Sequence, residues 1–263
     1  MKNYVAIILS FCISNFVLAQ ITTTQQILCS SQVNDSFEIY ISTPKNYNAA
    51  NTYNVVYYCD ANLKSGKLLR ETINQKEVST KIQNTIFVGV GHIGNYHVLR
   101  RRDFILPSIN NNDTIPQSKN YGQTENFYQF LKLELKPLIQ SSYHVKNSSI
   151  FGHSLGGLFT FYCLFKNENL FTNYYALSPA LWIDKYNIYE FNKLQKSLNS
   201  TSTLYLSAGG LETMNHIKKG ADDMNEFLTF KKYNNLNFVY EVHSGKTHNS
   251  QVAVSITYLL NHL

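Results

Sequence analysis

The segment Gly-His-Ser-Leu-Gly at residues 152–156 is the part of the chain whose residue types and spacing indicate chemistry most directly. It fits the pattern Gly-x-Ser-x-Gly of a nucleophile elbow, in which a serine occupies a sharp turn between a strand and a helix. Glycines two residues away on either side leave room for the crossing chain, and free N–H groups at the helix start can receive a developing oxyanion. The pattern therefore predicts that Ser154 is a nucleophile.

The residues around Ser154 favour an elbow over the alternative, which is an ordinary glycine-rich turn. The apolar pair at residues 150–151 precedes the segment, as the end of a strand would. Gly156 and Gly157 would let a following helix lie close to a sheet. Apolar residues with helical spacing do follow, namely Leu155, Leu158, Phe159, Tyr162, Cys163 and Phe165.

A serine hydroxyl is a poor nucleophile near neutral pH unless a base removes its proton and an acid orients that base. In elbow enzymes the acid and then the histidine follow the serine along the chain. His248 lies in the polar turn 244–249, between the last predicted strand and the last predicted helix, where its side chain would point over the sheet edge. His243 is the alternative, but it falls within the strand pattern itself. We therefore predict that His248 is the base.

Glu212 is the predicted orienting acid. It follows a strand and a glycine turn at residues 204–211, on the strand directly before the one that leads to His248. Asp184 is the competitor, because it follows the preceding strand and the segment 178–182.

The rest of the chain alternates between predicted strands and helices that would hold these residues in place. Such alternation predicts an α/β fold with a mostly parallel sheet covered by helices on both faces. With 263 residues, of which 44% are hydrophobic and 15% charged, the chain can form one large core, and we expect a single domain. The predicted strands are 36–43, 54–59, 85–90, 149–151, 174–177, 203–207 and 236–242; the predicted helices are 68–75, 122–142 with a kink at Pro137, the segment after Ser154, 188–198, 216–233 and 251–262, and a long loop follows residue 90.

Residues 89–94 read Gly-Val-Gly-His-Ile-Gly and fit the dinucleotide-binding pattern Gly-x-Gly-x-x-Gly after a strand. Such a site needs a helix whose N-terminus faces the pyrophosphate. Residues 95–103 show no apolar helical face, and Asp113 lies in a polar, asparagine-rich loop instead of at a strand end. We therefore expect no nucleotide here, and we expect the glycines to bend a strand end beside the site.

Residues 1–19 are expected to be a secretory signal peptide, and residues 20–263 the mature domain. Lys2 precedes an apolar run from Tyr4 to Leu18, and Ala19 ends a segment of small or apolar residues suited to cleavage. No later apolar run reaches the roughly 18 residues needed to cross a bilayer. We expect an exported protein, periplasmic or secreted, without a membrane span.

Charge and cysteine content argue against several other classes. The formal net charge of +6 comes from basic residues that are dispersed apart from the run 100–102, which argues against nucleic-acid binding. Three scattered cysteines remain after removal of the signal peptide, too few for a disulfide framework, although a bridge between Cys29 and Cys59 is the alternative. The eight histidines show no metal-ligand spacing. We expect no metal and no cofactor, and the sequence leaves the oligomeric state open.

Residues 151–159 and 176–182 resemble the serine esterase family that includes S-formylglutathione hydrolases, feruloyl esterases, siderophore esterases and mycolyltransferases. The resemblance covers about residues 36–248 and implies the α/β-hydrolase fold. The segment 57–62 resembles the family's strand that ends in Asp-Gly, whose next residue lends an N–H to the oxyanion hole. The resemblance implies Asn62 and Leu155 as the oxyanion donors, with Ala61 standing where the family has glycine.

Two further segments bear on the substrate. Residues 101–107 resemble the family's Arg-x-x-Asp-aromatic-x-Pro stretch at the pocket rim, with Pro107 one residue late. This implies that Arg101 and Arg102 bind substrate, for which the alternative is a solvated loop. Trp182 is expected in a loop at the carboxyl end of a strand, where ligand sites form, and its alternative is a place in the core.

Together these features predict an exported serine esterase that acts on a small-molecule ester through an acyl-enzyme. His248 would take the proton of Ser154, and Glu212 would hold the imidazole. The arginines favour an anionic substrate such as a ferric catecholate siderophore ester. The alternatives are an acyltransferase or a feruloyl or acetyl polysaccharide esterase, and a catalytically silent hydrolase-like binding protein, against which the order of these three residues argues.

Overall fold

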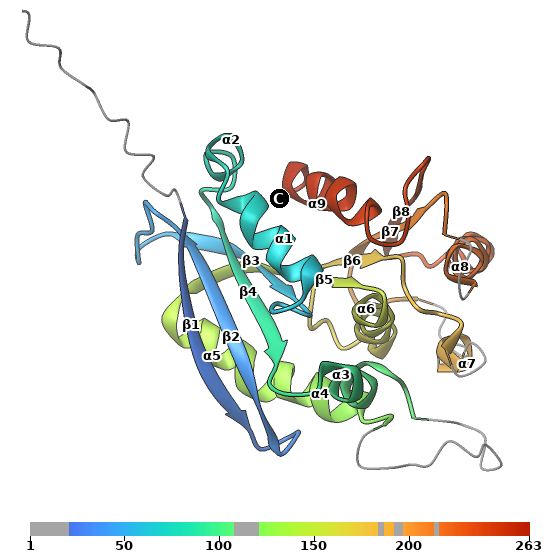
Figure 1. Cartoon of the computed structure of the whole chain (residues 1–263), viewed down its shortest axis with the longest axis horizontal. Helices are drawn as coiled ribbons and strands as arrows, with labels where there is room; N and C mark the ends of the chain where they lie inside the picture. Colours follow the sequence, from blue (N-terminus) through green and yellow to red (C-terminus); the bar gives the residue numbers. More distant parts are fainter. Residues whose placement is uncertain (1–20, 108–120, 184–186, 192–196, 213–215) are drawn as a thin grey trace, which may run out of the picture.

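The structure is a computed structural model that describes residues 21–107, 121–183, 187–191, 197–212 and 216–263 (Figure 1). The expected signal peptide at residues 1–19 and the acid candidate Asp184 lie outside the described residues. The described strands form one eight-stranded sheet in the order β1-β2-β4-β3-β5-β6-β7-β8. Their bounds are β1 (Ile21–Ser30), β2 (Asp35–Pro44), β3 (Thr52–Tyr58), β4 (Thr85–His92), β5 (His144–His153), β6 (Asn173–Leu177), β7 (Ser202–Gly209) and β8 (Leu236–His243).

The predicted α/β fold with a mostly parallel sheet is confirmed. The strands in the order β4-β3-β5-β6-β7-β8 run parallel to one another, whereas at one edge β1 pairs antiparallel with β2, and β2 antiparallel with β4. Every residue of β4 is buried, as expected for a strand that is covered on both faces. In β3, Val55 and Val56 face opposite sides of the sheet and join separate hydrophobic clusters.

Helices cover both faces of the sheet (Figure 1). On one face α1 and α9 pack against the smaller cluster, through side chains such as Leu69 and Ile256. On the other face the larger cluster joins helices from α3 to α8, through side chains such as Phe104, Phe159 and Met224. The helix bounds are α1 (Lys64–Ile73), α2 (Lys76–Ser79), α3 (Tyr96–Phe104), α4 (Thr124–Phe130), η1 (Leu131–Leu135), α5 (Lys136–Ser142), α6 (Leu155–Lys166), α7 (Asn187–Phe191), α8 (Ile217–Lys231) and α9 (Gln251–Asn261).

Helix α3 stands where the sequence predicts a loop, so that prediction was wrong. Its buried positions include Arg102 and Asp103, which form an ion pair with each other. A buried ion pair on the core-facing side breaks the apolar periodicity by which a helix is recognised in a sequence. Gly91, near the end of β4, packs against the side chain of Asn62, because a Cβ there would lie 2.8 Å from Cγ of Asn62.

The predicted helix 122–142 is continuous but changes its winding. A π-helical turn, η1, separates α4 from α5 and ends directly before Lys136 and Pro137. Proline lacks an N–H, and its ring clashes with the carbonyl four residues earlier in an α-helix. The wider π turn is one of the ways in which a helix accommodates such a disruption.

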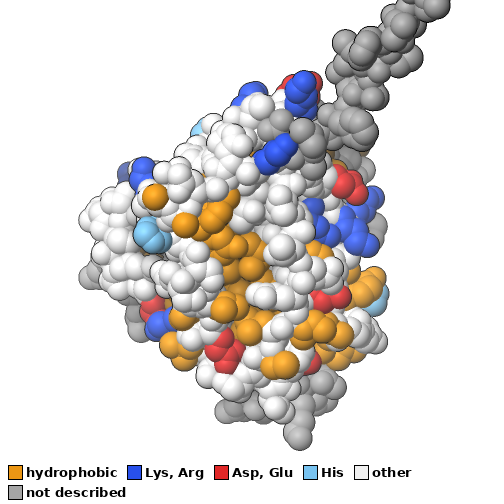
Figure 2. All heavy atoms as spheres, turned by 90° about the vertical axis from the view of Figure 1, so that its left-hand side faces the viewer, with side chains coloured by type: hydrophobic (Ala, Val, Ile, Leu, Met, Phe, Trp, Pro, Cys, Tyr) orange, Lys and Arg blue, Asp and Glu red, His pale blue; other side chains and the backbone are white. Residues whose placement is uncertain are grey.

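Strand β1 was not predicted either. It is rich in threonine and glutamine, and most of its residues are exposed, so its sequence has no apolar alternation. Pairing with β2 along its whole length holds it in place. Figure 2 shows this side of the molecule, where hydrophobic side chains gather in the middle of the face and Lys and Arg side chains lie toward its margins.

The described part of the chain contains three cysteines. Cys29, Cys59 and Cys163 are all unbonded, so the alternative of a Cys29 to Cys59 bridge is wrong. Among the described residues, no helix has the length and apolar character needed to cross a membrane. Within the same residues, no group of His, Cys, Asp and Glu side chains is arranged to hold a metal ion.

Candidate active site

Ser154 occupies the turn between β5 and α6, with a backbone φ of 61° and a ψ of −116°. This conformation is strained for a residue that has a side chain. Two hydrogen bonds hold it: the Ser154 N–H donates to the Leu177 carbonyl at 2.9 Å, and the Ser154 carbonyl accepts from the Ala180 N–H at 3.0 Å. The end of β6 and the loop that follows it therefore lock the turn.

The glycines beside Ser154 make the tight turn sterically feasible. A Cβ on Gly152 would lie 2.1 Å from the carbonyl oxygen of Gly156. A Cβ on Gly157 would lie 3.0 Å from the Cα of Pro179, which follows β6. The turn at Ser154 thus has the geometry of a nucleophile elbow, with α6 lying close to the sheet.

His248 and Glu212 are hydrogen-bonded to each other. Nδ1 of His248, in the loop between β8 and α9, lies 3.0 Å from Oε2 of Glu212, which follows β7. Because an ionised carboxylate only accepts hydrogen bonds, Nδ1 is the donor, and Nε2 of the neutral imidazole is left as an acceptor. The His248 side chain is 31% exposed and that of Glu212 only 1%, so the imidazole is accessible while the carboxylate is covered.

Glu212 has two further hydrogen-bond donors, the Ser178 hydroxyl and the Gly209 N–H, both of which bond Oε1. Burial by itself would raise the pKa of Glu212, but the hydrogen bonds from His248, Ser178 and Gly209 together lower it below its usual range. The carboxylate therefore stays ionised near neutral pH. Ser178 was not among the predicted site residues; its place directly after a predicted buried strand is the signal that could have found it.

Ser154 and His248 line two adjoining cavities, with volumes of about 280 and about 600 Å³. The smaller cavity faces α1 and α9 and includes Lys64. The larger faces the loop after β6 and the start of α8, and includes Trp182 and Leu155. Among the described residues the Ser154 hydroxyl makes no hydrogen bond. Ser154 and the His248 imidazole line the same two cavities without a hydrogen bond between them. Such contacts are often long in an empty site and tighten when substrate binds.

The alternative base, His243, does not share this place. His243, on β8, lies 3.2 Å from both the Tyr205 and the Ser255 hydroxyl oxygens and lines neither cavity. Asp184 lies outside the described residues. Of the two predicted bases, only His248 is therefore beside Ser154.

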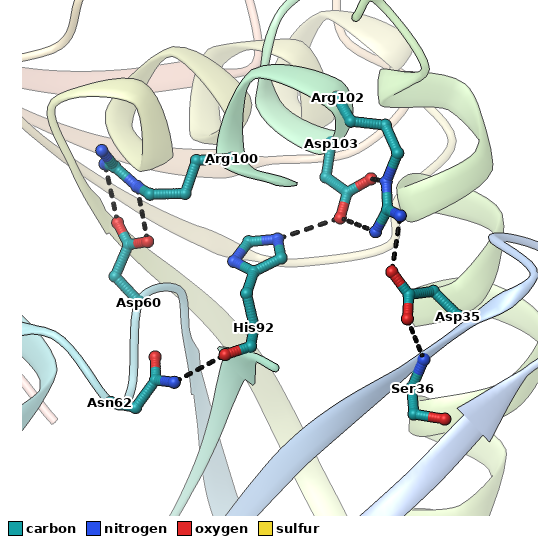
Figure 3. Close-up of polar contacts among 8 residues, drawn as sticks. All are labelled: Asp35, Ser36, Asp60, Asn62, His92, Arg100, Arg102 and Asp103. Carbon is teal, nitrogen blue, oxygen red and sulfur yellow. Dashed lines mark hydrogen bonds and ion pairs between the residues drawn. The ribbon is translucent and has the colours of Figure 1, made fainter. Parts of the chain in front are cut away.

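The arginines of α3 separate into two groups. Arg101 lines the larger cavity together with Trp182. Arg102 does not: its side chain is buried and paired with Asp35 and Asp103, so the expectation that it binds substrate is corrected (Figure 3). On a helix, adjacent residues point about 100° apart around the axis, so Arg101 and Arg102 point in clearly different directions.

Arg100 lines both cavities and was not among the predicted site residues. Its Nε and Nη2 donate to the two carboxylate oxygens of Asp60, at 2.7 and 2.9 Å (Figure 3). It was overlooked because α3 was expected to be a loop, and only a helical register shows which arginines share the face of Ser154.

The two expected oxyanion donors are placed differently. Leu155 is the first residue of α6, where N–H groups have no partner within the helix, and it lines the larger cavity. Asn62 lines a neighbouring surface depression instead of either cavity, and its Nδ2 donates to the His92 carbonyl at 2.7 Å. The turn that contains Asn62 still reaches the smaller cavity through Asp60 and Leu63.

Comparison with known proteins agrees with this geometry. Residues 30–254 match the model of the family described as "Putative esterase". Ferri-bacillibactin esterase BesA of Bacillus subtilis is 28% identical over 253 residues, which cover 89% of this chain and 87% of that protein. The crystal structure of BES protein from Bacillus cereus has a TM-score of 0.77 at 26% identity and covers 98% of both chains.

An IroE-like serine hydrolase from Shewanella oneidensis has the same fold, with a TM-score of 0.74 at 24% identity over 92% of this chain and 79% of that one. The single-domain sheet, the elbow at Ser154 and the match over residues 30–254 lead to one conclusion. This chain belongs to the esterase family of α/β-hydrolase fold, and it is a carboxylic ester hydrolase.

Proposed function

We propose that this protein is an exported esterase that cleaves an anionic siderophore ester through a Ser154, His248 and Glu212 triad. The observation that carries the proposal is the hydrogen bond from His248 Nδ1 to the buried Glu212, on an imidazole that shares both cavities with Ser154. A base oriented by an ionised acid and facing an elbow serine is the arrangement that acyl transfer requires.

The reaction proceeds in two halves. His248 Nε2 takes the proton of Ser154 as its oxygen attacks the ester carbonyl, and the oxyanion forms beside the Leu155 N–H. Each N–H that binds the oxyanion typically contributes roughly 3 to 4 kcal/mol to the transition state. His248 then gives the proton to the leaving alcohol, which leaves an acyl-enzyme on Ser154. A water molecule deprotonated by His248 releases the acid and restores the serine.

The wall of the larger cavity supports an anionic aryl substrate. Arg101 and His97 bring positive or polar groups to it, and Trp182 offers an aromatic surface. The acidic side chains at the two cavities, Asp60 and Glu212, are already paired with Arg100 and His248. The name of the similar protein from Bacillus subtilis, ferri-bacillibactin esterase, agrees with a ferric siderophore as substrate.

The apolar run between Lys2 and Ala19 supports export. The test is fractionation of cells that express the full chain, followed by N-terminal sequencing of the exported protein. A mature protein that begins at Gln20 is expected, whereas a protein that stays in the cytoplasm with residues 1–19 intact would contradict export.

The substrate is tested by comparing kcat/KM for a ferric catecholate triester, its iron-free form, a feruloyl ester, p-nitrophenyl acetate and p-nitrophenyl butyrate. We expect kcat/KM to be highest for a catecholate triester. A higher value for the feruloyl ester would instead indicate a polysaccharide esterase, and an acylated product formed from an added alcohol would indicate an acyltransferase.

The nucleophile is tested with Ser154→Ala, which removes the reacting oxygen and little volume. We expect loss of hydrolysis and of covalent labelling by a fluorophosphonate probe, with an unchanged thermal unfolding midpoint. Activity within a few-fold of the unmodified enzyme would overturn the triad. A folded wild-type protein that neither labels nor hydrolyses any ester would favour a silent binding protein.

A further inference from the structure

Arg100 joins two segments that are far apart in the sequence. From α3 it donates two hydrogen bonds to Asp60, which follows β3. Its Nη2 also lies 3.5 Å from the carbonyl oxygen of His153, the residue before Ser154. The Arg100 side chain is 15% exposed and that of Asp60 3%, so the ion pair is largely shielded from water.

The backbone around Asp60 needs such support. Asp60 has a φ of 58°, which lies in the left-handed region that non-glycine residues rarely adopt. Its carbonyl accepts from the Leu63 N–H at 2.9 Å, and the Ala61 N–H donates to the Val90 carbonyl at 3.0 Å. The Asp60 to Leu63 turn is therefore a defined conformation, and the guanidinium holds the side chain of its first residue.

The two joined segments are the ones that flank the reacting atoms. The elbow supplies Ser154 and the Leu155 N–H, and the Asp60 to Leu63 turn includes Asn62, whose N–H has no partner among the described residues. The strands that lead into these segments, β3 and β5, are neighbours in the sheet, with Tyr58 beside Phe151. A shift of the turn relative to the elbow would change the spacing of the N–H groups around the oxyanion.

We propose that Arg100 is a positioning residue that fixes the Asp60 to Leu63 turn against the elbow, and that it does not bind the substrate anion. This inference rests on the proposed ester hydrolysis at Ser154. The planar guanidinium matches a carboxylate with two parallel hydrogen bonds, which a lysine ammonium cannot do. Its bonds to Asp60 and to the His153 carbonyl commit Nε and Nη2 to the protein itself.

Helix α3, which carries Arg100, is held in place by ion pairs of its own. Nε2 of His92, at the end of β4, lies 2.9 Å from Oδ2 of Asp103, and Arg102 bridges Asp103 to Asp35 at the start of β2 (Figure 3). His92 also accepts the hydrogen bond from Asn62 through its carbonyl. This network therefore holds α3 through Asp103, and it holds the Asp60 to Leu63 turn through Asn62.

The test compares Arg100→Lys, Arg100→Met and Asp60→Asn on a neutral ester, p-nitrophenyl acetate, and an anionic one, p-nitrophenyl hemisuccinate. If Arg100 positions the turn, kcat falls by the same factor for both esters, about 10 to 100-fold, since misplaced oxyanion donors lower kcat. KM changes by less than about 2-fold, because ground-state binding is retained. The rate of fluorophosphonate labelling falls in parallel.

A substrate-binding role predicts a different pattern. KM would then rise for the hemisuccinate alone, and Arg100→Lys, which keeps the charge, would stay near the wild-type kcat on both esters. Either result overturns the proposal. The double variant Arg100→Met with Asp60→Asn should be no slower than the slower single variant, because both changes remove one interaction.

Two controls separate this inference from other failures. Lys219→Met, on the exposed side of α8, removes a positive charge from a side chain that lines neither cavity, and it should leave kcat and KM unchanged. A wild-type enzyme no faster than Ser154→Ala on both esters would overturn the proposed function, and this inference with it. If the wild type is active and a folded Arg100→Lys variant has the same kcat, the positioning role of Arg100 is overturned and the proposed function is not.

Discussion

The imidazole of His153 donates a hydrogen bond from Nε2 to the backbone carbonyl of His248, at 2.9 Å, and the two rings lie 4.4 Å apart between centroids. The residue before the proposed nucleophile thus holds the main chain of the proposed base. Burial lowers the pKa of His153 to about 3, and the electrostatic interactions of a protonated His153 with the His248 ring and with Arg100 act in the same direction. His153 is therefore neutral at physiological pH and acts as a hydrogen-bond donor.

The variant His153→Phe keeps a ring beside His248 but loses the donor. We expect kcat to fall about 5 to 10-fold, since a hydrogen bond of this kind contributes about 1 kcal/mol. The shape of the pH profile of kcat/KM between pH 5 and 9 should not change, because His153 does not titrate there. The measurement is a set of steady-state rates across that range. Disappearance of an ionisation from the profile would show that His153 takes part in proton transfer.

Glu212→Gln tests the acid. An amide can present its NH₂ to Nδ1 and favour the wrong imidazole tautomer, which lowers kcat by about 10⁴ in the corresponding serine-protease variant. We expect a loss of that order in burst-free steady-state assays, with KM nearly unchanged. The acid assignment is wrong if Asp184→Asn causes this loss and Glu212→Gln does not. Ser178→Ala, which removes one donor to Glu212, should reduce kcat far less.

Trp182 tests the larger cavity as the site of an aryl group. It is the only tryptophan of the chain, so an aryl or catecholate ligand bound there should quench the intrinsic fluorescence. Trp182→Ala should raise KM for bulky aryl esters more than for p-nitrophenyl acetate. Equal effects on both esters together with a large drop in the unfolding midpoint would indicate a packing role.

Lys136 gives a pH-dependent contribution to stability. It is buried, its Nζ donates to the Leu170 carbonyl, and burial lowers its pKa to about 8 from an ordinary 10.5. Between these values the unfolded chain holds a proton that the folded protein releases. Because the unfolded state then binds more protons, the free energy of unfolding rises with pH across this window.

Lys136→Met removes this titration. The unfolding free energy of the wild type should therefore increase relative to that of the Met variant between about pH 8 and 10.5, as measured by urea denaturation at a series of pH values. Lys132→Met, on the exposed side of the same helix, is the matched control and should follow the wild-type curve. Parallel curves for the wild type and Lys136→Met would contradict the lowered pKa.

Local patterns were sufficient for the central parts of the fold. Buried parallel strands such as β4 read as continuous apolar runs, and the elbow at Ser154 depends on the close approach of Gly152 to Gly156. His248 and Glu212 could be found because each lies in the loop that follows a strand, β8 and β7 respectively, at the same edge of a parallel sheet, so the order of elements brings them together.

The tertiary structure was needed for features that depend on partners far apart in the sequence. Helix α3 exists with Arg102 buried on its inner side because Asp35, 67 residues earlier, neutralises the guanidinium. Arg100 and Arg102 are indistinguishable in the sequence, yet one faces Ser154 and the other the core, since helical rotation sets their directions. Residue types and spacing thus determined the chemistry of the site, whereas burial and pairing of charges across the tertiary structure determined which arginine serves it.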